Sequence, residues 1–94
     1  MPESICELLL TEVAEAKLAR RAISDVEVRQ TLFNTYVMIE NPRSVQKGAR
    51  WLMIGRTNGG RILTIVVEKT IDPTTWIIVT AWDSAPVERR LLER

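Results

Sequence analysis

The sequence predicts one α+β domain over residues 1–94, in which an antiparallel sheet is combined with two N-terminal helices and a short C-terminal helix. Three observations indicate this class. Residues 35–82 contain β-branched and apolar runs separated by turn dipeptides, two capped helical segments precede them, and a third capped segment follows. The expected order is strand, helix, helix, four strands and helix, and 94 residues are enough for one hydrophobic core.

The first segment, Ser4–Leu10, could form a strand or the start of a helix. We favour a strand, because Thr11 is a typical N-cap and places the start of a helix just after it. This helix is expected over about residues 12–21, where acidic side chains come early and basic ones late, as the helix dipole favours. Its apolar stripe, which includes Val13 and Ala16, is thin, so one side of the helix should face water.

A second helix is expected to begin at a capping box in residues 24–27, which read Ser-Asp-Val-Glu. The serine side chain can accept a hydrogen bond from the glutamate amide while the glutamate side chain reaches back to the serine amide. The helix should cover about residues 25–33, with Val28 and Leu32 on its buried face. Asn34 is expected to end it.

The remaining strands are bounded by turn residues. Thr35–Ile39 is rich in β-branched and aromatic side chains and predicts a strand, and Asn41–Ser44 should then form a turn. The Asp72-Pro73 dipeptide within Thr70–Thr75 predicts another turn. The next strand, Trp76–Trp82, is apolar on both faces from Ile77 to Val79, as expected of a strand inside the sheet.

Ser84 could cap a last short helix over about residues 85–92. Trp76 and Trp82 lie six residues apart, which places them on the same face of their strand. Together with Trp51 they could stack on nucleobases, but core packing is the simpler interpretation, to which Trp82 is the candidate exception.

The best-defined element is a β-hairpin of Trp51–Ile54 and Ile62–Val67, joined through the Asn58-Gly59 dipeptide. A two-residue or a four-residue loop gives the same register, which pairs Arg56 with Arg61, Ile54 with Leu63 and Leu52 with Ile65. This register would place two guanidinium groups side by side at the hairpin tip, where an anion could bind between them.

Two alternatives to this arrangement remain open. Arg56 and Arg61 could be solvated side chains that splay apart, since charged side chains are common at exposed rims. A three-residue loop with Gly60 in a bulge would shift the register by one residue and separate the two arginines.

The composition narrows the chemistry. Apolar residues form 46% and charged residues 27% of the chain, as in soluble globular proteins. The one cysteine, Cys6, is expected to be a small buried residue, and without histidine we expect neither a metal site nor a cofactor. Acid–base chemistry would therefore depend on carboxylates, Lys, Arg or Tyr. We find no apolar run of eighteen residues and no leader, so we expect a cytoplasmic protein without a membrane segment.

The net charge of +1 conceals an asymmetry. Residues 1–40 have four basic and seven acidic side chains, whereas residues 41–94 have nine basic and five acidic ones. Such a distribution can attract a polyanion to the second half of the chain. The segment 41–67 has no acidic residue and contains Arg43, Lys47, Arg50, Arg56 and Arg61.

Several segments resemble the BrnT-like toxins of type II toxin–antitoxin modules, which belong to the RelE/ParE superfamily. The hairpin Gly55–Val67 resembles the family's Gly-Arg-Thr and Gly-Arg hairpin, and Ala19–Val28 resembles the start of its helix. Val79–Trp82 and Glu88–Glu93 resemble its ending, and the order and spacing agree from about residue 7 to 93. The resemblance implies a RelE/ParE-like fold. The sequence departs from the family at four positions, where Arg21 replaces His, Ala22 Gly, Trp82 Arg and Leu92 Tyr.

The resemblance implies a ribonuclease that cuts messenger RNA without a metal and is inhibited by a cognate antitoxin. Such cleavage needs a base, an acid and cations that neutralise the phosphorane. For the reaction that the resemblance implies, Arg56, Arg61 and Arg89 could supply the cations and Glu68 or Glu88 the base. The candidate RNA-binding residues are Arg50, Arg56, Arg61, Trp82 and Arg90.

Structural interpretations compete with these roles. Glu68 could pair with Lys69 or a neighbouring arginine at a strand end, and Glu88, Arg89 and Arg90 could form the solvated face of the last helix. An alternative function is a non-catalytic protein–protein interaction module on the same fold, which would use Trp82 and nearby apolar surface to bind a partner chain or form a homodimer.

Overall fold

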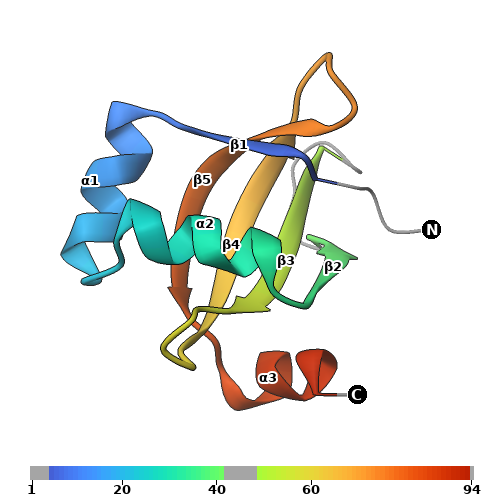
Figure 1. Cartoon of the computed structure of the whole chain (residues 1–94). Helices are drawn as coiled ribbons and strands as arrows, with labels where there is room; N and C mark the ends of the chain where they lie inside the picture. The colour runs from blue at the N-terminus through green and yellow to red at the C-terminus, as the bar shows by residue number, and fades with distance from the viewer. Residues whose placement is uncertain (1–4, 42–48, 94) are drawn as a thin grey trace.

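The computed structural model describes residues 5–41 and 49–93 and shows an α+β fold with a five-stranded mixed sheet and three helices (Figure 1). The strand order in the sheet is β1-β5-β4-β3-β2. The element order agrees with the expectation from the sequence. The elements are β1 (Glu7–Leu10), α1 (Glu12–Arg20), α2 (Asp25–Phe33), β2 (Tyr36–Glu40), β3 (Arg50–Arg56), β4 (Ile62–Lys69), β5 (Thr75–Asp83) and α3 (Pro86–Leu92).

The sheet is antiparallel from β2 to β5, as expected, but β1 joins it as a parallel edge strand beside β5. The register pairs Leu8 with Trp76 and Leu10 with Ile78. The strand β5 therefore lies inside the sheet, which confirms the interpretation of its apolar faces. The pattern of the short first strand gave no indication of a partner near the other end of the chain.

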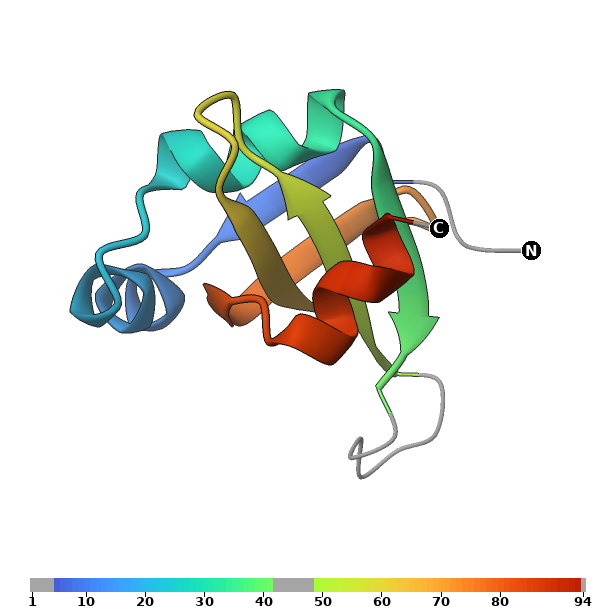
Figure 2. The ribbon, with the colours of Figure 1, turned by 90° about the horizontal axis from the view of Figure 1, so that it is seen from below.

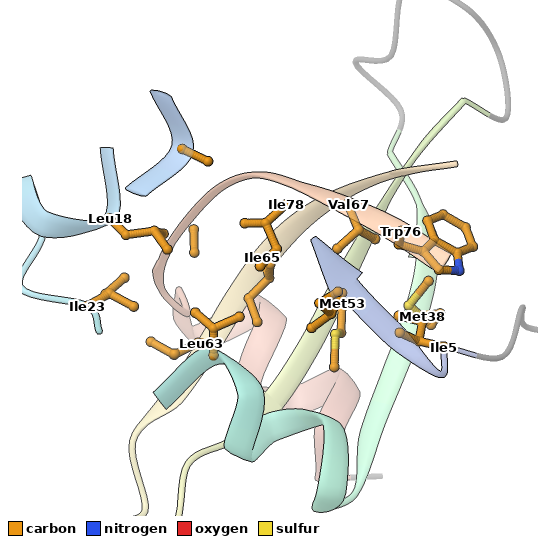
Figure 3. Packing of buried hydrophobic residues seen from close by; sticks show 14 residues of the cluster. Ile5, Leu18, Ile23, Met38, Met53, Leu63, Ile65, Val67, Trp76 and Ile78 are labelled. Atoms are coloured by element: carbon orange, nitrogen blue, oxygen red, sulfur yellow. The ribbon is translucent and has the colours of Figure 1, made fainter. Parts of the chain in front are cut away.

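The helices cover opposite faces of the sheet, with α1 and α2 on one face and α3 on the other (Figure 2). The main core lies under α1 and α2 and includes Met53, Ile65 and Trp76 (Figure 3). A smaller cluster of Ile54, Ile62 and Leu92 lies under α3. Alternating residues of β3 and β4 thus supply both clusters, because successive strand side chains point to opposite faces.

The first helix begins as expected, since the Thr11 side chain accepts a hydrogen bond from the Ala14 amide at 3.1 Å. Its buried side chains are Ala14 and Leu18 rather than the predicted stripe, and Val13 is 68% exposed. The helix rests on β5, and this contact selects a face that is rotated from the one that the weak pattern suggested.

The end of α1 is a Schellman motif with an alanine in the left-handed conformation. The Ile23 amide donates to the Leu18 carbonyl and the Ala22 amide to the Ala19 carbonyl, while Ala22 has φ of 56°. Leu18 and Ile23 are both buried, which completes the apolar contact of this motif.

We expect Ala22→Gly to stabilise the protein by about 0.5–1 kcal/mol, because glycine adopts positive φ without a Cβ clash. The matched control is Ala16→Gly inside the same helix, which should destabilise it by about 1 kcal/mol. Urea unfolding of both variants checks the prediction. Loss of stability in both variants would contradict it.

The second helix matches the sequence prediction closely. The Ser24 side chain accepts from the Glu27 amide at 3.1 Å, and Glu27 accepts from the Ser24 amide at 3.0 Å. Val28 is buried, Leu32 packs against the main core, and Asn34 is the C-cap.

The register of the central hairpin differs by one residue from the favoured prediction and follows the three-residue alternative. Arg56 pairs with Ile62, and the Thr57 amide donates to the Arg61 carbonyl. Gly60 has φ of 89° and its amide donates to the Thr57 carbonyl, so it occupies the bulge position after the turn. Arg56 and Arg61 therefore project from opposite faces of the sheet, and the predicted pair of neighbouring guanidinium groups is wrong.

Trp76 and Trp82 do not lie on the same face of β5 as predicted, because this strand contains a second bulge. In β5, Ile78 pairs with Val67 and Thr80 with Val66, which leaves Val79 as an extra residue. One extra residue reverses the alternation of side chains. Trp76 is therefore buried under α1 and α2, whereas the Trp82 side chain lies on the α3 face.

Three smaller expectations have different outcomes. Ser84 is not the cap of α3, which begins with Ala85 as its N-cap and Pro86 as its first residue. Cys6 is exposed rather than buried. The predicted Asn41–Ser44 turn lies largely outside the described residues. In the described part of the chain, no helix is long and apolar enough to cross a membrane.

Candidate functional site

The most connected side chain of the described structure is Arg61, at the end of the central hairpin. Its guanidinium donates to Asp83 through Nε at 2.6 Å and Nη2 at 3.0 Å, and its Nη1 lies 3.2 Å from both carboxylate oxygens of Glu27. It also donates to the carbonyls of Ala22 and Arg21. Arg61 thus ties the hairpin to the α1–α2 connection and to the end of β5.

The charges in this cluster stabilise one another. Hydrogen bonds from Arg61 lower the pKa of Asp83. The pKa of Glu27 is lowered mainly by the backbone amide of Ser24 and further by Arg61, despite an opposing effect of burial. Asp83 and Glu27 in turn raise the pKa of Arg61, so its guanidinium is always charged.

We expect the Arg61 cluster to make the free energy of unfolding fall at acidic pH but stay constant near neutral pH. Carboxylates with a lowered folded-state pKa contribute fully above about pH 5 and lose that contribution as pH falls below about 4. The raised pKa of Arg61 has no effect in the usual range, and the chain has no histidine. Urea unfolding at pH 7 and pH 3 should show a smaller difference between wild type and Arg61→Ala at pH 3. An equal difference at both pH values would contradict this assignment.

A second polar group lies on the opposite face of the sheet, around Glu88 of α3. Its Oε1 accepts hydrogen bonds from Thr64 Oγ1 at 2.9 Å, from Trp82 Nε1 at 3.1 Å and from the Ala85 amide at 2.8 Å. Thr64 also shares a hydrogen bond of 2.8 Å with the buried Ser84. Glu88 therefore fixes the start of α3 and the orientation of the Trp82 ring, instead of being a solvated helix residue.

Trp82 also contacts a cation from the C-terminal end of α1. The Arg21 guanidinium carbon lies 6.0 Å from the centroid of the Trp82 ring, within the range of a cation–π interaction. Arg21 and Trp82 are two of the positions at which the sequence departs from the BrnT-like pattern. The structure brings these two departures into direct contact.

The other predicted site residues lie at two ends of the sheet. Arg50 forms an ion pair of 2.9 Å with Glu68, which confirms the strand-end pairing proposed for that glutamate. Arg56 lies at the other end of β3, where it is 3.7 Å from Glu93 and lines a shallow hollow with Asn34. Arg50 and Arg56 are the first and last residues of the seven-residue strand β3, so they lie about 20 Å apart.

The segment 41–67 has no acidic residue of its own, but carboxylates outside it neutralise the charges of its described arginines. Its described arginines Arg50, Arg56 and Arg61 each pair with a carboxylate from another part of the chain. Arg89 and Arg90 are exposed on α3, where Arg89 also lowers the pKa of Asp83. The described residues contain no group of three or more His, Cys, Asp or Glu side chains that could hold a metal ion.

A family model for a domain of unknown function, DUF4258, matches residues 10–83. The chain belongs to the DUF4258 family. The match covers the chain from the end of β1 to the end of β5, and so includes the whole Arg61 cluster. No curated protein matches the chain.

The sequence alone does not point to several residues of the Arg61 and Glu88 networks. It indicates only a helix cap for Glu27, and no role for Asp83 or Thr64. The capping box was the one available signal for Glu27, because a carboxylate held at a helix start is also free to accept from another donor. No local signal relates Asp83 to Arg61, since 22 residues separate them.

Proposed function

We propose that this chain is the toxin of a type II toxin–antitoxin module with a BrnT-like, RelE/ParE-like fold, and that it cleaves messenger RNA without a metal ion. The observation that carries the proposal is a group of three exposed arginines on and beside α3. Exposed Arg56 lies near the C-terminal end of this helix, beside Glu93, and Arg89 and Arg90 extend from the helix itself. The helix is about 10 Å long, so these guanidiniums could contact consecutive phosphates of one RNA strand.

The observed contacts support different roles for the individual residues from those expected from the sequence. Arg61 keeps its charge inside a network with two carboxylates, so we assign it to the stability of the site. Glu68 and Arg50 lie at the far end of the sheet, away from α3. Of the two predicted acids, Glu88 lies on the same helix as Arg89 and Arg90, and in the described structure all three of its hydrogen bonds end on Oε1. Its second oxygen is the best candidate for accepting a proton.

The test is expression of the wild type and of an Arg56→Ala, Arg89→Ala double variant from an inducible promoter. We expect wild-type induction to arrest growth and to degrade messenger RNA, and the purified protein to cut RNA in EDTA. The double variant should lose at least tenfold in cleavage, because guanidiniums neutralise the charge of the transition state. Arg50→Ala is the matched control, since it removes one exposed arginine at the far end. Unchanged growth and intact RNA with the wild type would refute the proposal.

A protein–protein interaction module remains the second candidate, because α2 exposes two large apolar side chains on one face. Val26 is 62% and Phe33 86% exposed, and they are seven residues apart, which places them two helical turns from each other. A cognate antitoxin or a second copy of the chain could cover this face. A stable oligomer or complex that ignores RNA at low salt would favour this candidate. Binding to RNA that weakens steeply with salt would favour the first.

A further inference from the structure

The Trp82 ring is held in one orientation while remaining partly exposed. Its indole N–H donates to Glu88 Oε1, and Glu88 is itself fixed by hydrogen bonds from Thr64 and from the Ala85 amide. The strand fixes the other end of the side chain, since Trp82 pairs with Thr64 in the sheet. A ring that is already ordered loses little conformational entropy when a flat ligand stacks on it.

One cation lies over this ring. Arg21 lies over the ring face with its guanidinium carbon 6.0 Å from the centroid, and it is exposed, so it can move to admit a ligand. Arg89 and Arg90 follow Glu88 directly on α3 and are exposed as well. An aromatic face covered by a guanidinium, with two more exposed arginines on the adjacent helix, matches a nucleotide, whose base is flat and whose phosphate is negative.

We propose that Trp82 is a stacking platform for one unpaired nucleobase of RNA, that Arg21 closes over the base, and that Glu88 is a positioning residue for the ring. This inference rests on the proposed function. It adds that the site selects single-stranded RNA, because a base inside a duplex already has both faces stacked. It also assigns Glu88 a role that does not require proton transfer.

The test measures the affinity of the wild-type protein for a short unstructured RNA, for the same strand in a duplex, and for a strand of the same length with abasic sites. All three RNAs carry phosphates, but only the intact single strand offers unpaired bases at every position. We expect the intact single strand to bind about tenfold or more tightly than the abasic strand, within the range known for stacking on aromatic residues.

Protein variants locate the effect. Trp82→Leu should bind intact and abasic strands equally, with the affinity that the wild type has for the abasic strand, and Trp82→Phe should keep most of the preference. Glu88→Ala should reduce the ratio of the two affinities, and Glu88→Gln should restore it, because its amide oxygen can still accept from the indole.

The outcomes separate this inference from the proposed function. A wild-type protein that binds RNA with a steep salt dependence, but binds intact and abasic strands equally, overturns the stacking site and leaves the toxin proposal standing. A wild-type protein that binds no RNA overturns both. The wild-type comparison requires no substitution, so a variant that fails to fold cannot obscure the result.

Discussion

Replacing Arg61 with alanine is expected to lower the free energy of unfolding by about 2–3 kcal/mol. The substitution leaves Glu27 and Asp83 without their shared cation, and it removes the donor to the carbonyls of Ala22 and Arg21. The Arg61 side chain is 26% exposed, so water only partly replaces these interactions. For a domain of this size the loss corresponds to a fall in Tm of roughly 10 °C or more.

Arg56→Ala is the matched control for this prediction. It removes a guanidinium from the same hairpin, but its ion pair with Glu93 is 3.7 Å long and both side chains are about half exposed. Such pairs contribute less than about 1 kcal/mol. Urea unfolding of the two variants, analysed with a common slope, measures the difference. Equal midpoints would show that Arg61 contributes no more to stability than an ordinary surface charge. The catalytic role predicted for it from the sequence would then be the better interpretation.

Gly55→Ala is expected to destabilise the protein by about 2 kcal/mol. A Cβ atom at this position would lie 2.9 Å from the Cβ of Thr31 and 3.2 Å from the Cβ of Tyr36. Neither neighbour can rotate away, because both atoms are attached directly to the backbone. Thr31 is fully buried in α2, so the helix itself would have to move off the sheet.

Gly59→Ala provides the control, since a Cβ there meets only the Thr57 hydroxyl at 3.9 Å. It should change the free energy of unfolding by less than about 0.5 kcal/mol. Thermal and urea unfolding of both variants test the contrast. Equal stability of the Gly55 and Gly59 variants would mean that α2 and β3 are not as closely packed as the structure describes.

The local signals of the sequence were reliable wherever one short segment decides the structure. The N-cap Thr11, the capping box of Ser24 and Glu27, the stop at Asn34 and the turn at Asp72-Pro73 all have the predicted positions. Each depends on hydrogen bonds between residues a few positions apart, or on the restricted dihedral angles of proline, so the local sequence contains all the information.

The functional interpretation depended on geometry that the local sequence does not contain. A single bulge residue decides which face a strand presents, and the two bulges at Gly60 and Val79 reversed the placements predicted for Arg61 and Trp82. The segment 41–67 has no acidic residue, which suggested that its arginines are free to bind an anion. Arg61 is not, because Glu27 and Asp83 reach it from distant segments.

Local patterns in the sequence were enough to predict the order and approximate bounds of the elements, the caps of the first two helices, and the position of the central hairpin. They did not predict that β1 lies beside β5, that carboxylates enclose Arg61, or that Arg21, Trp82 and Glu88 meet. The reason is physical. Caps and turns are short-range interactions of the backbone, whereas register, bulges and ion pairs are chosen by the packing of segments that are far apart in the chain.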